Sequence, residues 1–235
     1  MKNYIKISFL LFFFISTTSK AQVLISLLFG DALNTEKIEF GLTGGLNRSY
    51  FNDIQESKGL NNFNLGFYFH IRFKESSFLS TGVLVKSNVG ATGMPTYPLG
   101  DADFDGLFEE GTLTTKINTF YVPIMWHQRF NNRWFLEGGF QAGLRSKAFD
   151  YFDTSLLDGD LNFKKEVSDN FTRLDAGAVG GIGYKFKKEL KSMSAGVLYY
   201  YGFVDVNKDH EVLSRNSSLN IYLRIPIGAG KSNME

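Results

Sequence analysis

Apolar and polar residues alternate with a period of two along most of this chain. In the clearest segment, one face carries six apolar side chains: Phe63, Leu65, Phe67, Phe69, Ile71 and Phe73. The other face carries polar, basic or small residues: Asn64, Gly66, Tyr68, His70 and Arg72. Because a β-strand points successive side chains to opposite surfaces, this pattern predicts a strand with one apolar and one polar face.

The same pattern recurs and predicts about eight strands in all. The other seven segments lie around residues 38–47, 79–85, 120–126, 134–147, 173–185, 193–203 and 219–227. An even number is typical of single-chain barrels of the bacterial outer membrane. Pro123 lies inside the fourth segment and lacks a backbone donor, so it predicts a bulge or irregularity there.

The connections between these segments alternate between short and long. The short ones are residues 74–77, 131–132 and 187–192, and the long ones are 52–61, 88–114, 148–170 and 205–213. Transmembrane barrels have this alternation, with tight periplasmic turns and long extracellular loops. The sequence therefore predicts an all-β protein, an eight-stranded antiparallel up-and-down transmembrane β-barrel with a periplasmic N-terminus.

A soluble β-sandwich or a lipocalin-like barrel would show the same period, so periodicity alone leaves that alternative open. The loop alternation favours the membrane. So do the many rings near strand ends, in a chain with 24 Phe and 11 Tyr, because such barrels carry aromatic girdles. Glycine, arginine and glutamate alternate with tyrosine on the polar faces, as the filled interior of a small barrel requires.

The N-terminus predicts export. Lys2 and Lys6 precede an apolar run over residues 7–16, and Ser19 and Ala21 are small residues that follow it. This pattern predicts a signal peptide cleaved between Ala21 and Gln22. An uncleaved anchor is the alternative, but a spanning helix needs about 20 apolar residues. The predicted organisation is a signal peptide (1–21), a periplasmic segment (22–36), the barrel (37–228) and a C-terminal tail (229–235), placed in a Gram-negative outer membrane.

Composition excludes several chemistries. The chain has no cysteine, which excludes disulfides, cysteine-bound metals and thiol nucleophiles. Its 25 Lys and Arg nearly balance its 24 Asp and Glu, so no excess of positive charge points to nucleic acid as a partner.

Three segments resemble a known family. They are residues 27–51 (LLFGDALNTEKIEFGLTGGLNRSYF), 119–130 (TFYVPIMWHQRF) and 174–186 (LDAGAVGGIGYKF). On these segments the chain resembles the PorT-like outer-membrane β-barrel family, a group also described as porin-like. The resemblance implies the barrel fold and the outer membrane, and in some relatives a link to protein secretion. One departure is the last predicted strand, which ends near Ile227 instead of on a terminal aromatic residue.

The inward faces are predicted to carry charges of both signs. The candidate interior charge network is Glu39, Arg72, Arg129, Glu137, Arg145, Arg173, Asp175 and Arg224, and Lys86, Lys147 and Lys185 fall on the same faces. Side chains can fill an eight-stranded barrel, and buried charges must be paired. Two interpretations follow: a salt-bridged plug that closes the barrel, or a polar path for a small solute.

The three histidines raise the question of enzyme activity. His70 and His127 are predicted to point inward, and His210 lies in a loop. Some membrane barrels are lipid-modifying hydrolases with a Ser-His-acid arrangement. The chain has no nucleophile-elbow motif and no zinc-helix spacing, so we predict that it is not an enzyme.

An acidic loop resembles the opening of a calcium loop. Asp101, Asp103, Asp105 and Gly106 follow the pattern D-x-D-x-D-G, but the twelfth position is Thr112 instead of Glu. Either this is a solvated acidic loop, or it binds calcium weakly and bridges lipopolysaccharide. No other cofactor is expected.

These observations predict a small barrel that acts as a structural or surface-interaction protein through its long loops. The longest lie around residues 95–108 and 149–162. The alternatives are a narrow channel, a transport or secretion accessory component, and a lipid-modifying enzyme. The expected partners are outer-membrane lipid, lipopolysaccharide and a protein that contacts the loops, with the barrel itself a monomer.

Overall fold

A computed structural model of the 235-residue chain describes most of the predicted barrel. The described residues are 35, 37–54, 57–101, 106–156, 159–189, 191–208 and 213–227. The predicted signal peptide, all of the predicted periplasmic segment except residue 35, and the C-terminal tail lie outside the described residues. Asp103, Asp105 and His210 also lie outside them. No helix within the described ranges is long and apolar enough to cross a membrane.

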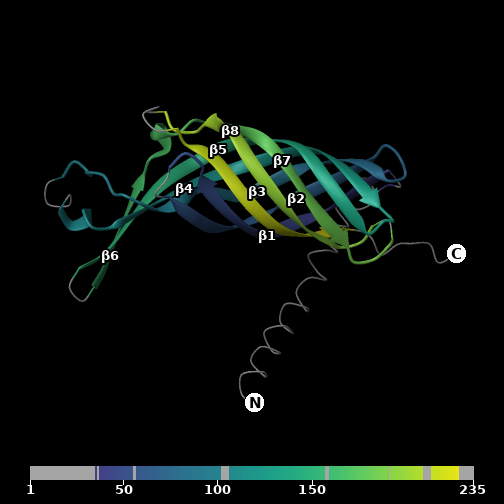
Figure 1. Ribbon diagram of the computed structural model, residues 1–235, viewed down its shortest axis with the longest axis horizontal. Coiled ribbons are helices and arrows are strands. Elements are labelled where there is room, and N and C mark those ends of the chain that lie inside the picture. Colours follow the sequence, from purple (N-terminus) through teal and green to yellow (C-terminus); the bar gives the residue numbers. More distant parts are fainter. Residues whose placement is uncertain are drawn as a thin grey trace, which may run out of the picture.

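The described chain forms nine β-strands, and eight of them close into a ring (Figure 1). The elements are β1 (Ile38–Phe51), β2 (Lys58–Arg72), β3 (Ser77–Met94), β4 (Thr112–Phe130), β5 (Trp134–Leu156), β6 (Gly159–Glu166), η1 (Ser168–Asn170), β7 (Leu174–Lys185), β8 (Ser194–Asp205) and β9 (Arg215–Pro226). All pairings are antiparallel, and β1 closes the ring on β9. The predicted eight-stranded up-and-down barrel is confirmed.

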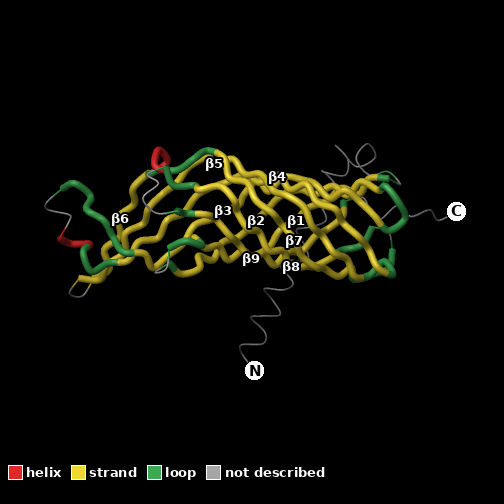
Figure 2. The backbone as a smooth tube through the Cα atoms, turned by 45° about the horizontal axis from the view of Figure 1, so that its top comes forward, coloured by secondary structure: helices red, strands yellow, loops and turns green. Residues whose placement is uncertain are grey.

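The ninth strand was not predicted. Residues 148–170 were expected to be a loop, but β5 continues to Leu156 and returns as β6, which pairs only with β5. Figures 1 and 2 both place β6 beyond one end of the ring. The alternation of apolar and polar residues identifies strands that face lipid. The β5–β6 hairpin lies outside the apolar part of the wall, so it does not show this pattern.

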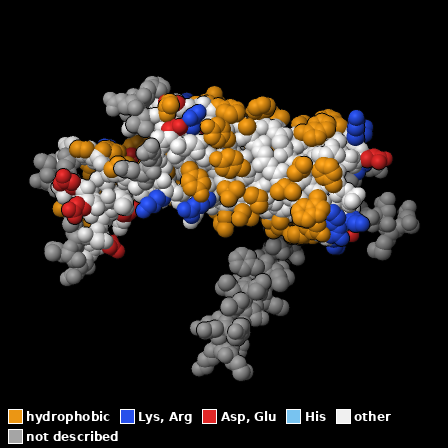
Figure 3. Space-filling view, in the orientation of Figure 1, with side chains coloured by type: hydrophobic (Ala, Val, Ile, Leu, Met, Phe, Trp, Pro, Cys, Tyr) orange, Lys and Arg blue, Asp and Glu red, His pale blue; other side chains and the backbone are white. Residues whose placement is uncertain are grey.

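The outward surface of the ring carries a broad band of exposed apolar side chains (Figure 3). Among them are Leu46, Phe67, Ile124, Trp126, Phe140, Leu144, Ile182 and Ile221. Phe140 is 68% exposed and Leu144 61% exposed. A contiguous apolar surface of this kind is unfavourable in water, whereas a lipid bilayer buries it.

The inward surface combines glycines with aromatic rings on the neighbouring strand. Four glycines lie directly opposite an inward ring in the register: Gly41 with Tyr68, Gly143 with Tyr121, Gly183 with Phe135, and Gly196 with Tyr222. A Cβ atom at Gly183 would lie 2.2 Å from the Phe135 ring, so the ring occupies the space that a side chain would need. This pairing explains why glycine and aromatic residues are both frequent on the polar faces.

Among several register shifts in the ring, two bulges reverse the inward–outward alternation at predicted inward charges. On β3 the register passes from Leu84 to Lys86 while β2 advances one residue, which leaves Val85 as an extra residue. On β5 Ser146 is extra opposite Asn118 and Thr119 of β4. A single extra residue turns every later side chain to the other face. The bulge or irregularity predicted at Pro123 takes the second form: no register shift occurs there, but the β3–β4 pairing is interrupted between Thr81–Ile124 and Leu84–Tyr121.

The two ends of the ring differ in their connections. Residues 73–76, 131–133 and 186–193 are short turns at one end, and the longer loops and the β5–β6 hairpin lie at the other. Short turns face the periplasm in barrels of this kind. We therefore call the short-turn end periplasmic and the opposite end extracellular.

Candidate functional site: the filled lumen and the extracellular extension

The periplasmic half of the lumen holds a buried group of ionisable side chains. This lumenal charge cluster consists of Glu39 on β1, His70 on β2, His127 and Arg129 on β4, Glu137 on β5 and Arg224 on β9. All six are 5% exposed or less. Five strands supply them because each residue occupies an inward position near the periplasmic end of its strand.

Each carboxylate in the cluster is paired with an arginine and a tyrosine. Arg224 Nη1 lies 2.6 Å from Glu137 Oε1, and the Tyr222 hydroxyl donates to Glu137 Oε2 at 2.9 Å. Arg129 Nη2 donates to Glu39 Oε2 at 3.1 Å, and Tyr68 donates to Glu39 Oε1 at 2.9 Å. Two carboxylates thus balance two guanidinium groups, as burial of charge requires.

The arginines also define the hydrogen bonding of the histidines. Arginine can only donate, so His127 Nε2 must accept the bond from Arg129 Nε at 3.0 Å. The proton of His127 then lies on Nδ1, which donates to Glu137 Oε1 at 2.8 Å. His70 Nε2 likewise faces the Arg224 guanidinium at 3.3 Å and accepts from it, which places the proton on Nδ1, 3.4 Å from Glu39 Oε1 and 3.2 Å from Arg129 Nη2. The geometry therefore favours two neutral imidazole rings.

His70, His127 and Glu137 resemble a zinc ligand set, with ligand atoms within 4.8 Å of one another. The lone pair of His127 Nε2 is already engaged by Arg129, and both guanidinium groups would repel a divalent cation. A hydrogen-bonded network therefore explains this donor set better than a metal centre does. Neither histidine hydrogen bonds to a serine or threonine hydroxyl in the described chain, and the absence of enzyme activity stays a prediction.

A second polar cluster lies in the extracellular half of the lumen. The Asp175 carboxylate accepts hydrogen bonds from the Tyr121 hydroxyl at 2.6 Å, the Tyr200 hydroxyl at 2.8 Å and Asn216 Nδ2 at 2.9 Å. Apolar side chains surround this cluster, among them Ile117, Phe171 and Val179. Three donors on one buried carboxylate join four strands across the lumen.

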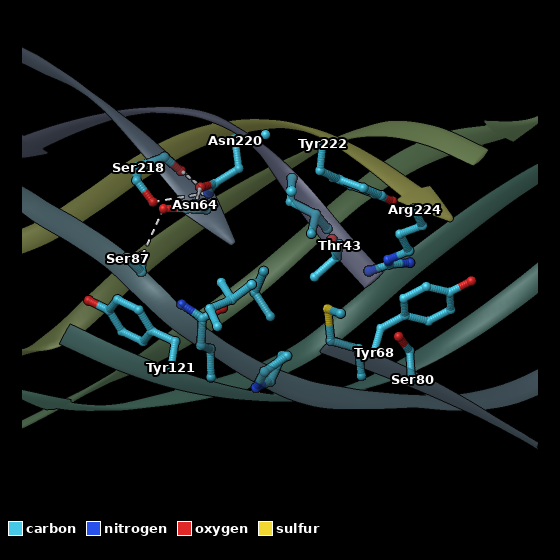
Figure 4. Close-up of a pocket in the computed structure, with 18 of the residues that line it drawn as sticks. Thr43, Asn64, Tyr68, Ser80, Ser87, Tyr121, Ser218, Asn220, Tyr222 and Arg224 are labelled. Carbon is cyan, nitrogen blue, oxygen red and sulfur yellow. Dashed lines mark hydrogen bonds between the residues drawn. The ribbon is translucent and has the colours of Figure 1, made fainter. Parts of the chain in front are cut away.

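Between the two clusters lies a cavity of about 50 Å³ (Figure 4). Its wall includes Asn64, which donates to Asn220 Oδ1 at 2.8 Å and accepts from Ser87 at 2.9 Å. Roughly 10–15 Å³ of such space holds one water molecule, so a few waters fit. The described lumen is thus filled on both sides of a small cavity whose wall combines polar and apolar side chains.

The structure separates the predicted interior charges into groups. Glu39, Arg129, Glu137 and Arg224 come together in the lumenal charge cluster, while Asp175 lies apart from them. Lys185 is buried at the periplasmic mouth, where its Nζ donates to the Glu189 carbonyl at 2.7 Å. Arg72 is half-buried at the same mouth, near the Phe78 ring.

Four predicted inward charges lie apart from the lumenal charge cluster. Lys86 and Lys147 follow the bulges at Val85 and Ser146, which turn them outward. Arg145 lies at the second bulge, half-buried, and its Nε donates to the Thr172 carbonyl at 3.1 Å. Arg173 is exposed just before β7 begins. Neither Arg145 nor Arg173 forms an ion pair with the lumenal charge cluster among the described residues, so their part in the network stays a prediction.

Sequence reasoning missed the tyrosines that complete the lumen. Tyr68, Tyr121, Tyr200 and Tyr222 each donate to a buried carboxylate. Their signal in the sequence is an inward tyrosine on a strand whose neighbour carries glycine on the inward face. That signal becomes specific only when the cross-strand register is known.

The apolar core of the lumen continues into the extracellular extension, which is the β5–β6 hairpin beyond the ring together with the loop that carries Tyr97 and Phe108. Phe152 of β5 is fully buried, with ring centroids 5.1 Å from Tyr97, 5.8 Å from Phe108 and 6.1 Å from Phe163 of β6. Asp150 accepts hydrogen bonds from the Thr115 hydroxyl at 2.6 Å and the Tyr97 hydroxyl at 2.8 Å. Of the predicted calcium loop, only Asp101 and Gly106 are described, so that site stays a prediction.

Burial raises the pKa of Asp150, although the two hydroxyl donors oppose the shift. A carboxyl whose pKa is higher in the folded chain stabilises the fold below its unfolded pKa and loses that effect as pH rises through the raised pKa. We therefore expect the extension to resist proteolysis better at about pH 4 than at about pH 8. Cleavage rates of the purified barrel, normalised to an unstructured reporter peptide, measure this, and Asp150→Asn should flatten the profile. An equally steep profile in Asp150→Asn would assign the effect to other groups.

The closed ring, the apolar outer band and the polar lumen define a small transmembrane β-barrel of the outer membrane of a Gram-negative bacterium. The family comparison agrees: residues 21–208 match the model of the outer membrane protein beta-barrel domain, and the chain belongs to this family. The match is to the domain family as a whole, so the narrower PorT-like resemblance stays a prediction. A comparison with curated protein sequences finds no match.

Solved structures with a similar fold include Ail, the attachment invasion locus protein of Yersinia pestis, at 12% identity and a TM-score of 0.42, covering 80% of this chain and 99% of Ail. Neisserial surface protein A is 10% identical with a TM-score of 0.39, over 80% of this chain and 96% of that protein. OprG from Pseudomonas aeruginosa is 12% identical with a TM-score of 0.32, over 83% and 96%.

Proposed function

We propose that this protein is a surface-interaction protein of the outer membrane and that its extracellular extension contacts the partner. The β5–β6 hairpin carries this proposal. It extends past the ring: its β5 arm also pairs with β4, whereas β6 pairs with β5 alone and is not needed to close the barrel. An ordered feature that the barrel does not require, held on a rigid scaffold, is where binding function commonly lies.

The order of the extension supports a defined binding surface. Phe108, Phe152 and Phe163 pack together beyond the apolar band, and two hydroxyls anchor the base of the hairpin on Asp150. A neighbouring extracellular loop is also tied down, because Arg215 makes a two-pronged contact with Asp53 at 2.7 and 3.0 Å. Preorganised surfaces lose less conformational entropy on binding.

The packed lumen supports a surface role over a narrow channel. The lumenal charge cluster and the Asp175 cluster fill the described lumen on both sides of the small cavity. Passage of a solute would require both clusters to separate. Separating Arg224 from Glu137 would leave two unpaired charges in the interior. Breaking a buried ion pair in this way costs on the order of several kcal/mol.

A shortened hairpin tests the proposed function. Residues 152–163 are replaced by an Asn-Gly turn, so that the Tyr151 and Lys164 pair becomes the last rung of the hairpin. Cells displaying each variant are incubated with arrays of glycans and purified extracellular proteins. We expect the wild type to bind at least one probe and the shortened variant to lose that binding, with heat-modifiable migration on gels unchanged.

The matched control shortens a connection at the periplasmic end, where residues 187–191 are replaced by the same Asn-Gly turn. This variant should bind as the wild type does, because the changed turn faces away from the cell surface. Equal binding by the hairpin-shortened variant would contradict the proposal. A wild type that binds none of the probes would contradict it as well.

A further inference from the structure

A groove lies on the outer wall of the barrel near the extracellular end of the apolar band. Its volume is about 380 Å³, and the side chains that matter around it are Lys86, Lys116, Lys164, Phe120, Phe149 and Tyr151. We call it the lysine groove. We propose that the lysine groove binds the phosphate groups of a glycolipid in the outer leaflet of the membrane. The proposal goes beyond the hairpin function and does not depend on it.

The strand register brings the three lysines together from three strands. Lys86 points outward because the bulge at Val85 reverses the alternation of β3. On β4, Lys116 is paired with Phe149 of β5, and on β6, Lys164 is paired with Tyr151 of β5. Lys116 lies opposite Gly90, four residues along β3 from Lys86, and all three lysines line the same groove.

The groove lies at the height where acyl chains give way to head groups. Val85 and Phe120 are exposed, outward-facing members of the apolar band. Lys86 follows Val85 directly, and Lys116 lies four residues from Phe120 toward the extracellular end of β4. In Figure 3, lysine and arginine side chains gather at the ends of the apolar band. A phosphate on a lipid whose chains cover this band would meet the lysines without leaving the membrane.

The charges of the groove have few internal partners. In the described chain, no carboxylate lies within salt-bridge distance of Lys86, Lys116 or Lys164. Lys164 Nζ instead lies 3.8 Å from the centroid of the Phe149 ring. The nearby acid Glu166 is engaged by Lys147 at 3.3 Å and by Ser168. Three lysines beside an apolar, aromatic surface complement a ligand that is anionic at one end and apolar at the other.

The test measures lipid binding by the full-length barrel in detergent, using native mass spectrometry. The probes are bisphosphorylated lipid A, dephosphorylated lipid A and inorganic phosphate. The test variant is Lys86→Gln, Lys116→Gln and Lys164→Gln combined. The control removes the same charge from exposed lysines at the periplasmic turns: Lys74→Gln, Lys187→Gln and Lys188→Gln combined.

We expect the groove variant to lose affinity for bisphosphorylated lipid A on the order of a hundredfold, while the control binds as the wild type does. The wild type should bind dephosphorylated lipid A as poorly as the groove variant binds the phosphorylated form. Because all the replaced lysines are on the surface, both variants should keep heat-modifiable migration. Equal losses in both variants, equal affinity of the wild type for the two lipids, or displacement of lipid A by inorganic phosphate would each overturn the assignment.

Discussion

Replacing Arg224 with methionine should destabilise the barrel by about 3–5 kcal/mol. The substitution leaves Glu137 buried without an arginine partner, with His127 and Tyr222 as hydrogen-bond donors and His70 Nε2 at 3.9 Å. Desolvation of an unpaired carboxylate is the dominant cost, because the methionine side chain retains much of the apolar volume of arginine. Urea unfolding in phospholipid vesicles, followed by the fluorescence of Trp126 and Trp134, measures the free energy of unfolding.

Two further variants isolate the cause. The double variant Glu137→Gln, Arg224→Met removes both charges and should recover most of the lost stability. Arg173→Met removes an exposed arginine near the start of β7 and should change stability by less than about 0.5 kcal/mol. If Arg224→Met lowered the free energy of unfolding as little as Arg173→Met, the lumenal charge cluster would not stabilise the barrel.

Gly183→Ala should destabilise the barrel by about 2 kcal/mol, although it adds one methyl group. The new Cβ would lie 2.2 Å from the Phe135 ring and 2.8 Å from the Ala195 carbonyl oxygen. The ring cannot retreat freely, because it packs against His127 with centroids 4.5 Å apart. The same urea experiment measures the effect.

Gly138→Ala is the matched control, because nothing lies within 4 Å of a Cβ at that outward position. It should be neutral or slightly stabilising. Alanine reduces the conformational entropy of the unfolded chain, which stabilises the folded barrel by about 0.5 kcal/mol. Adding Phe135→Leu to Gly183→Ala should recover part of the loss. Equal effects at Gly138 and Gly183 would argue that glycine–ring packing does not constrain the lumen.

The barrel was predictable because the bilayer imposes one simple rule on its outer surface. Every strand must present apolar side chains to lipid, so Phe63 to Phe73 and seven similar segments reveal the wall directly. The prediction that Glu39, Glu137 and Arg224 point inward agrees with the structure. Each of them lies on a stretch of strand whose alternation no bulge interrupts.

The departures have physical causes that leave little trace in one sequence. Val85 and Ser146 are ordinary strand residues, so nothing marks them as the extra residues that turn Lys86 and Lys147 outward. Strand β6 lies beyond the apolar band and therefore follows no lipid-facing pattern. The partners of Glu137 come from β4 and from β9, which lies almost ninety residues along the chain, so they depend on a cross-strand register that no local pattern contains.

Planar-bilayer recording of the purified, refolded barrel tests most directly whether its lumen is closed and its function lies on its surface. A lumen filled by the lumenal charge cluster and the Asp175 cluster predicts insertion without stepwise conductance, both for the wild type and for the hairpin-shortened variant. Discrete, reproducible conductance steps from the wild type would contradict a closed lumen and assign the function to transport.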